Sequence, residues 1–301
     1  MELISVLIPI HKKTDKNYRS VNSILNQTYR NIEIIILLDG LNEHLYKELN
    51  NYYKIKINTG IIRIFFLNKN YGLTKMLNMG LKESNGKFIM RNDYDDISLP
   101  YRAEEQMKIF NYNKDIKLVY SFFSFFNDKN NKLKNVKSDL TKNKLKNKFN
   151  YKNTIAHSSV MFNKDFIIKI GGYNESYYVS QDFELWSRLI NNNINNIGLS
   201  KKILTKINLC HDSVSKKNSF NQRYNSIFIC MNNKFYPKIF DSTKINNLSR
   251  EESNYFNSLT YAYLYENKLT FYSIVRNFRS LSKVYFHHPS LLFKRILYKH
   301  E

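Results

Sequence analysis

Two kinds of hydrophobic pattern alternate along the first hundred residues. Continuous apolar runs, which are typical of strands buried on both faces of a parallel sheet, occupy residues 3–10, 32–38, 61–67 and 87–91. Between them, apolar residues recur at helical spacing near residues 21–25, 42–53 and 73–81. This alternation predicts an α/β fold in which a doubly wound, mostly parallel sheet is flanked by helices.

Strand and helix patterns continue less regularly to about residue 215. Residues 117–126 and 158–162 predict two strands, and a polar turn at residues 127–131 favours a hairpin after the first of them. Residues 182–190 predict a helix. The Lys- and Asn-rich residues 132–152 are expected to form a mobile or partly helical surface segment.

The pattern changes again from about residue 216, where the alternation stops. One helical face collects the apolar residues Phe271, Ile274, Val275, Phe278 and Leu281. We therefore expect an α/β domain over residues 1–215 and a basic helical extension over residues 216–301 that packs on it. The alternative is that the extension rests on an anionic membrane surface.

Composition narrows the classes of protein and partner. The apolar content of 43% excludes wholesale disorder, and the two cysteines, Cys210 and Cys230, exclude a disulfide framework. A net charge of +22 favours anionic partners, but the basic residues are scattered, so no nucleic-acid partner is expected. The start of the chain lacks the features of a signal peptide. We expect a cytoplasmic protein. The alternative is a protein that also contacts the inner face of the membrane peripherally.

Polar residues with candidate chemistry follow three of the predicted strands. They are His11, Asp39 and the group Asp93, Asp95 and Asp96. In open α/β sheets, ligands bind at the carboxyl ends of the strands. Three carboxylates within four positions repel one another unless they are solvated or neutralised, and oxygen ligands of this kind suit Mg²⁺ or Mn²⁺. The alternative is a charged loop that caps the following helix.

Four segments carry a resemblance to a known family: SVLIPI, SILNQTYRNIEIIILLDG, YGLTKMLNMGLKESNGKFIMRNDYDDISLPYR and GGYNESYYVSQDFELWSRL. In their order and spacing, from Ser5 to about Leu189, they resemble family 2 glycosyltransferases, which have the GT-A fold and use nucleotide-sugar donors. The resemblance implies an inverting hexosyltransferase-type enzyme with a nucleoside-diphosphate donor, a UDP-sugar first. Its acceptor would be a hydroxyl of a glycan or lipid-linked glycan, in the synthesis of cell-surface polysaccharide or lipooligosaccharide.

The resemblance also implies roles for the residues at the strand ends. Asp39 would contact the nucleotide base, and the backbone around Pro9 and His11 would line the same pocket. Family members often carry two adjacent acids where this chain has only Asp39. The metal motif falls on Asp93 and Asp95, with Asp95 as the direct ligand of Mn²⁺ or Mg²⁺ bound to the diphosphate.

Two further positions take roles from the resemblance. Similar enzymes have an acid pair whose Asp is the general base. This chain has Gln181 in place of the first acid and keeps the base as Asp182. His211 would complete the metal site or touch the diphosphate, although it stands one position nearer to Ser213 than in the usual pattern. The alternative for His211 is an ordinary surface histidine.

Structural roles are expected for several other residues near these motifs. Asp96 is expected to bond backbone groups of the following turn, and Trp186 to lie in the core. Arg91 and Arg102 are expected to be surface charges rather than phosphate ligands. His157 is either near the acceptor or structural.

Two other functions remain as alternatives. A sugar nucleotidyltransferase would carry a Gly-rich loop after the first strand, where this chain has PIHKK at residues 9–13. A non-catalytic protein with a basic surface for nucleic acid would bind duplexes with steep salt dependence.

Overall fold

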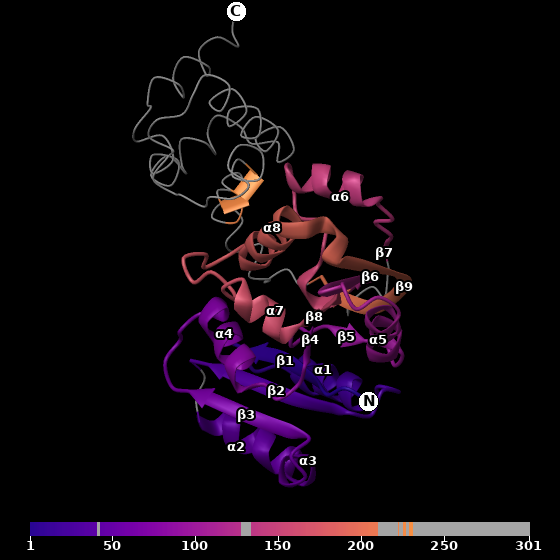
Figure 1. Cartoon of the computed structure of the whole chain (residues 1–301). Helices are drawn as coiled ribbons and strands as arrows, with labels where there is room; N and C mark the ends of the chain where they lie inside the picture. Colours follow the sequence, from indigo (N-terminus) through magenta and orange to yellow (C-terminus); the bar gives the residue numbers. More distant parts are fainter. Residues whose placement is uncertain (41–42, 128–133, 210–221, 223–224, 227–228, 231–301) are drawn as a thin grey trace, which may run out of the picture.

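The computed structural model describes residues 1–40, 43–127, 134–209, 222, 225–226 and 229–230 (Figure 1). Most of the predicted extension at residues 216–301 therefore lies outside the described residues. The same holds for the proposed domain boundary at residue 215 and for any contact of the extension with a membrane. Within the described part of the chain, no helix is long and apolar enough to cross a membrane.

Strands and helices alternate through the first part of the chain, as the hydrophobic pattern predicts. The elements there are β1 (Ile4–Ile10), α1 (Lys16–Leu25), β2 (Ile32–Asp39), α2 (Glu43–Tyr52), α3 (Lys54–Asn58), β3 (Ile62–Leu67), α4 (Leu73–Glu83) and β4 (Phe88–Arg91). The rest of the described chain is more mixed. It comprises β5 (Ile97–Ser98), α5 (Arg102–Tyr112), β6 (Leu118–Phe126), β7 (Lys134–Val136), α6 (Lys142–Phe149), β8 (Val160–Asn163), α7 (Lys164–Lys169), α8 (Gln181–Asn193) and β9 (Ile197–Asn208).

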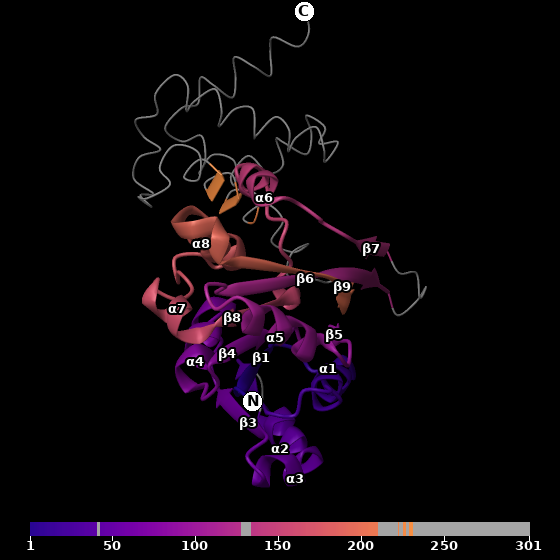
Figure 2. The same ribbon diagram turned by 45° about the vertical axis from the view of Figure 1, so that its right-hand side comes forward.

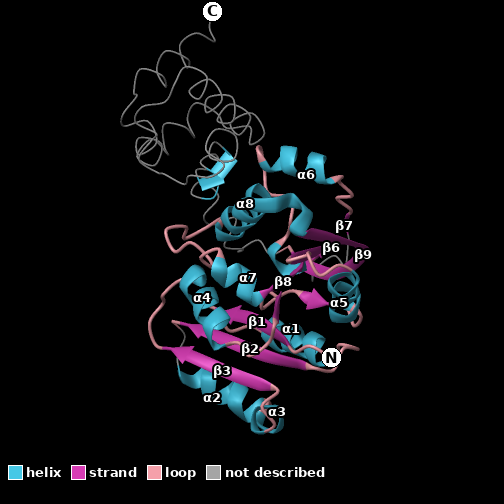
Figure 3. Cartoon of the chain, viewed as in Figure 1, coloured by secondary structure: helices cyan, strands magenta, loops and turns pink. Residues whose placement is uncertain are grey.

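The strands form one sheet with the order β3-β2-β1-β4-β8-β6-β9-β5, and β7 pairs with β6. The pairs among β1, β2, β3 and β4 are parallel, so their carboxyl ends share one edge. β8 runs antiparallel to both β4 and β6, whereas β9 runs parallel to β6. The expectation of an α/β fold with helices flanking a largely parallel sheet is confirmed (Figure 3).

Both faces of the sheet are buried, which explains why its first strands are continuous apolar runs. Alternate side chains of β2 enter different core clusters. Ile35 and Leu37 join one cluster with α4 and α8, whereas Ile34 and Ile36 join another with α1, α2 and α5. Apolar surface is therefore buried on each face of the sheet, and this burial is the main favourable contribution to the free energy of folding.

The long strand β9 is the longest of several elements that the sequence pattern did not predict. Its pairing with β6 passes from Ser121↔Ser200 to Phe122↔Ile203, so Lys201 and Lys202 are extra residues in a bulge. Both lysines are exposed, and they interrupt the alternation that would otherwise indicate a strand. In Figure 2, β6 and β9 lie side by side below α6 and α8. The strand carries Asn208 to the carboxyl-end edge of the sheet.

The surface segment at residues 132–152 is partly helical, the second of the two alternatives expected for it. Its described part contains β7 and α6. The side chains of Leu145 and Phe149 on α6 are buried and join the same core cluster as α8. These two apolar anchors fasten an otherwise lysine-rich helix to the domain.

The opposite edge of the parallel strands depends on a glycine beside a buried carboxylate. Glu33 is buried and accepts hydrogen bonds from Ser5 Oγ (2.5 Å) and the backbone N–H of Asn85 (2.6 Å). Gly86 donates its N–H to Ser5 Oγ at 2.7 Å. A Cβ added at Gly86 would lie 2.5 Å from the backbone nitrogen of Ser5, a distance that real contacts essentially never show.

We therefore expect Gly86→Ala to lower the free energy of unfolding by about 2–3 kcal/mol, the cost of an overpacked site where backbone must move. Urea unfolding followed by circular dichroism measures this. A control is Gly60→Asn, at a φ of +73° with no atom within 4 Å of an added Cβ. Because asparagine tolerates this φ, the control should change stability by less than about 0.5 kcal/mol. Equal stability of the two variants would contradict the close packing at Gly86.

Candidate active site

A cavity of about 330 Å³ opens at the carboxyl ends of the parallel strands. Asp39, Asp95 and Asp182 come from three distant stretches of the chain, and all three line it. Pro9 and His11, which follow β1, line the same cavity. Three acids that share one cavity are the arrangement that an enzyme interpretation requires.

Asp39 ends β2 and holds a loop of the cavity wall. Its side chain is buried, and its two carboxylate oxygens accept hydrogen bonds from the backbone N–H groups of Tyr71 (2.7 Å) and Gly72 (2.9 Å). Gly72 has a φ of +87° and directly precedes α4. Asp39 therefore orders the loop that leads into α4, a role that the sequence did not indicate.

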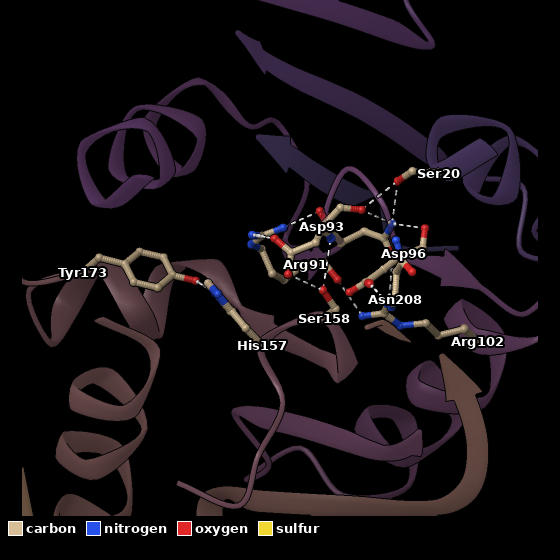
Figure 4. Close-up of polar contacts among 10 residues, drawn as sticks. Ser20, Arg91, Asp93, Asp96, Arg102, His157, Ser158, Tyr173 and Asn208 are labelled. Carbon is tan, nitrogen blue, oxygen red and sulfur yellow. Dashed lines mark hydrogen bonds and ion pairs between the residues drawn. The ribbon is translucent and has the colours of Figure 1, made fainter. Parts of the chain in front are cut away.

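Asp93 is held on both sides by neighbouring side chains (Figure 4). Its Oδ1 accepts a hydrogen bond from Arg91 Nη2 at 2.5 Å, and its Oδ2 accepts one from Ser158 Oγ at 2.8 Å. The backbone N–H of Asp93 donates to the same Ser158 Oγ at 3.0 Å. Although burial acts against the charged form, the guanidinium of Arg91 holds the pKa of Asp93 below its ordinary value.

Arg91 and Arg102 are fully buried, so the expectation that they are surface charges is wrong. Arg102 donates to the backbone carbonyls of Arg91 (2.8 Å) and Val160 (2.9 Å) and to Ser98 Oγ (2.8 Å). Burial lowers the pKa of Arg102 to about 9. These contacts join α5 to β4 and to the start of β8, and they fasten the strand end that carries the acids.

The other two acids after β4 face β9. Asp96 was expected to bond backbone groups of the following turn. Instead it is buried, and its Oδ1 accepts a hydrogen bond from the backbone N–H of Asn208 at 2.8 Å. Asp95 accepts a longer hydrogen bond, at 3.3 Å, from the side-chain amide of Asn208. Burial and the negative charge of Asp93 raise the pKa of Asp95 to about 6.

The carboxylates at this end of the cavity fit a divalent cation, provided that a bound ligand supplies the remaining oxygen atoms. Asp95 lines the cavity, and positive charge there would relieve its repulsion with Asp93. The described residues contain no group of three or more His, Cys, Asp or Glu side chains that could hold a metal ion. Oxygen atoms of a ligand would have to complete the coordination, as is usual for Mg²⁺. His211, the other predicted ligand, lies outside the described residues.

Asp182 lies in the first turn of α8, where a negative charge is favourable. Ser180, which directly precedes the helix, has a φ of +63° and is the non-glycine residue with positive φ in the described chain. Such strained backbone often marks functional sites. Asn153 Nδ2 donates a hydrogen bond to Asp182 Oδ2 at 2.9 Å. Burial raises the pKa of Asp182 to about 6.

Behind these acids lies a second polar contact that involves His157. Its Nε2 shares a 2.8 Å hydrogen bond with the hydroxyl of Tyr173 (Figure 4), and its ring meets that of Trp186 edge-on with 5.9 Å between centroids. Burial and the charge of Arg91 lower the pKa of His157 well below its ordinary value, which favours the neutral ring. Trp186 is fully buried, and its predicted place in the core is confirmed. His157 itself also lines the cavity.

Three residues of the site were missed because no local motif marks them. Ser158, Asn153 and Asn208 each contact an acid that is far away in sequence. Ser158 is adjacent in sequence to His157, for which a role near the acceptor or in the structure was expected. Small polar residues of this kind are common in loops, so sequence alone offers no signal to find them.

Comparisons with known proteins show the family of this chain. The family model described as Glycosyl transferase family 2 matches residues 5–171. The O-antigen biosynthesis glycosyltransferase WbnJ of Escherichia coli is 33% identical over 198 residues, which cover 64% of this chain and 73% of that protein. An uncharacterized glycosyltransferase of Methanocaldococcus jannaschii is 33% identical over 193 residues, which cover 63% of this chain and 65% of that protein.

The chain spans only part of some relatives. An uncharacterized glycosyltransferase of Rickettsia conorii is 29% identical over 221 residues, which cover 71% of this chain but 35% of that protein. Over the matched lengths, this chain therefore covers less than two thirds of the relatives from M. jannaschii and R. conorii.

Solved structures share the fold at low identity. The structure of S. aureus TarS 1-349 in complex with UDP-GlcNAc has a TM-score of 0.66 at 14% identity, and the match covers 89% of this chain and 76% of that one. The mannosyltransferase PcManGT from Pyrobaculum calidifontis, in complex with GDP-Man and Mn²⁺, has a TM-score of 0.59 at 8% identity, over 97% of this chain and 83% of that one. The predicted GT-A-type fold is confirmed. Because the family model covers more than half of the chain, this protein belongs to glycosyl transferase family 2.

Proposed function

We propose that this protein is an inverting glycosyltransferase that moves a sugar from a nucleoside-diphosphate donor to a hydroxyl of a glycan or lipid-linked glycan. The observation that carries the proposal is the single cavity shared by Asp39, Asp95 and Asp182 at the carboxyl ends of the parallel strands. Family membership supports the class of reaction. The likeness in fold to TarS, solved in complex with UDP and with UDP-GlcNAc, supports a UDP-sugar as donor.

The donor would lie along the strand ends. Pro9, His11 and Asp39 line the part of the cavity where the nucleotide would bind. Asp95 and Asp93, with His211 as the third proposed ligand, would hold Mn²⁺ or Mg²⁺ against the diphosphate. The cation would supply positive charge to the departing nucleoside diphosphate. The complex of the P. calidifontis mannosyltransferase with Mn²⁺ supports the choice of metal.

Asp182 is the proposed general base. It lines the cavity from the first turn of α8. When the acceptor hydroxyl attacks the anomeric carbon from the face opposite the leaving diphosphate, a base must take its proton. A single displacement of this kind inverts the anomeric centre, so an α-linked donor gives a β-glycoside.

The acceptor class is inferred from named relatives. The E. coli relative is a glycosyltransferase of O-antigen biosynthesis. The amylovoran biosynthesis glycosyltransferase AmsE of Erwinia amylovora is 28% identical over 221 residues, which cover 73% of this chain and 81% of that protein. Both names point to cell-surface polysaccharide, whose assembly would present a glycan or lipid-linked hydroxyl.

A donor screen tests the proposed function. Thermal shifts of the full chain with UDP-, GDP- and dTDP-sugars, each with Mn²⁺ and with EDTA, should show stabilisation by a UDP-sugar that needs the cation. Turnover should release a nucleoside diphosphate. Release of pyrophosphate would instead indicate a sugar nucleotidyltransferase, and absence of stabilisation by every nucleotide sugar would refute the proposal.

The pH dependence of transfer should report the ionisation of Asp182. Its pKa is raised to about 6 by burial, and only the deprotonated carboxylate accepts a proton. We therefore expect kcat/KM to be level above about pH 7 and to fall about tenfold per pH unit below about pH 6. Initial rates with saturating Mn²⁺ between about pH 5 and 8 measure this. A profile that stays level through this range would exclude a base with such a pKa.

A further inference from the structure

Asn153 reaches the first turn of α8 from a segment far away in sequence. Its side-chain Nδ2 lies 2.9 Å from Asp182 Oδ2 and donates a hydrogen bond to it. Its Oδ1 accepts the backbone N–H of Ile155 at 3.0 Å, which closes a local turn. The amide thus joins the turn on one side to the carboxylate on the other.

These two contacts determine which way the amide of Asn153 faces. The N–H of Ile155 can only donate, and the ionised carboxylate of Asp182 can only accept. Exchanging the oxygen and nitrogen of Asn153 would therefore break both hydrogen bonds. Ile155 is buried in the same core cluster as Phe183 and Trp186 of α8, so packing holds the turn and the helix together.

We propose that Asn153 is a positioning residue for Asp182: it holds Oδ2 and so fixes the direction in which the carboxylate receives the proton of the acceptor hydroxyl. The proposal rests on the proposed function of Asp182 as general base. A carboxylate with one oxygen fixed cannot rotate freely about its last torsion, so the lone pairs of the other oxygen keep one direction. Orientation of this kind is what an efficient proton acceptor needs.

The proton and electron balance of the step is simple. The acceptor O–H bond breaks, its proton goes to the carboxylate of Asp182, and the acceptor oxygen forms a bond to the anomeric carbon. The bond between that carbon and the diphosphate oxygen breaks, and its electron pair leaves with the nucleoside diphosphate. Asn153 forms and breaks no covalent bond, and its N–H stabilises the ionised form of Asp182 before the transfer.

The electrostatic surroundings of Asp182 support this role. Burial raises the pKa of Asp182, and the charge of Asp93 adds to this, whereas hydrogen bonds from the backbone of Phe183 and Asp182 and from the side chain of Asn153 lower it. The titratable groups that line the cavity with Asp182 are His11, Asp39, Asp93, Tyr94, Asp95, Asp96, His157 and Tyr178. Four of them are carboxyl groups, and Asn153 donates a hydrogen bond to a fifth, Asp182.

Three variants separate positioning from a merely structural role. Asn153→Ala removes both contacts. Asn153→Asp keeps an oxygen for the N–H of Ile155 but replaces the donor to Asp182 by a carboxylate. Asn174→Ala is the matched control, because Asn174 Oδ1 closes an equivalent turn with the N–H of Ser176 at 3.0 Å.

The pKa of Asp182 is the primary measurement, because it needs no substrate. Carboxyl carbon NMR of the full chain labelled with ¹³C-aspartate, with the signal assigned through Asp182→Asn, should show a rise of about one pKa unit in Asn153→Ala and a larger rise in Asn153→Asp. Asn174→Ala should leave the pKa unchanged. An unchanged pKa in both Asn153 variants, or wild-type behaviour of Asn153→Asp, would overturn the proposal.

Turnover gives the second measurement. With UDP-GlcNAc and Mn²⁺, release of UDP should fall about tenfold in Asn153→Ala and further in Asn153→Asp, while the Kd for UDP stays as in the wild type. Undiminished UDP release in Asp182→Asn would reject the base itself, and so the proposed function. A pKa that shifts in the Asn153 variants without loss of turnover would reject only the positioning role.

Discussion

Asp182→Asn should abolish sugar transfer and leave nucleotide binding intact. Asparagine keeps the size and polarity of the side chain at the start of α8 but cannot take a proton from the acceptor. General bases typically contribute about 10²–10⁴-fold, so kcat should fall by at least about 100-fold. Steady-state kinetics measure kcat, and isothermal titration with UDP and Mn²⁺ measures the nucleotide affinity, which should change by less than about twofold.

The matched control for this variant is Asp165→Asn. Asp165 lies in the first turn of α7, so it has the same relation to a helix N-terminus, but it is exposed and does not line the cavity. Its replacement should leave kcat unchanged. If Asp182→Asn turns over donor near the wild-type rate, a different group must take the proton.

Asp95→Asn should remove the cation dependence of nucleotide binding. Asp95 lines the cavity, and burial and the negative charge of Asp93 both disfavour its charged form, so a bound cation would stabilise it. An amide is a weaker ligand for a hard cation than a carboxylate. We expect the affinity for UDP in the presence of Mn²⁺ to fall about 100-fold, to the level that the wild type shows with EDTA.

Titration of UDP with and without Mn²⁺ measures this effect on the full chain. Asp115→Asn, which removes an exposed acid from the loop after α5, is the control and should bind UDP as the wild type does. Manganese-dependent binding that survives in Asp95→Asn would place the cation elsewhere. Asp93→Asn is a less informative variant, because it also leaves the buried guanidinium of Arg91 without its carboxylate.

The first part of the fold could be predicted from sequence because β1, β2 and β4 are buried on both faces. β1 and β2 have no polar side chain in their middle, so an apolar run alone marks them. β9 could not be predicted in the same way. Its pairing with β6 depends on a bulge at Lys201 and Lys202, and a bulge is defined only by the partner strand.

The candidate acids were found because they directly follow predicted strands, and parallel strands end at one edge of a sheet. Their partners were not found. Burying Arg102 requires the carbonyls of Arg91 and Val160 as acceptors, and these come from two strands that meet only in the folded sheet. Sequence therefore favoured exposure for both arginines, and the structure reversed that expectation.

What the sequence by itself determined is the class of fold, the family, and the acids that its motifs carry, because local periodicity and motif order are properties of the chain alone. The tertiary structure alone decided the surroundings of each acid. It placed Arg91 and Ser158 on Asp93, Asn208 on Asp96 and Asn153 on Asp182. The physical reason is that hydrogen bonding and burial act between groups that are close in space, and residues up to 113 positions apart become neighbours only when the sheet has formed.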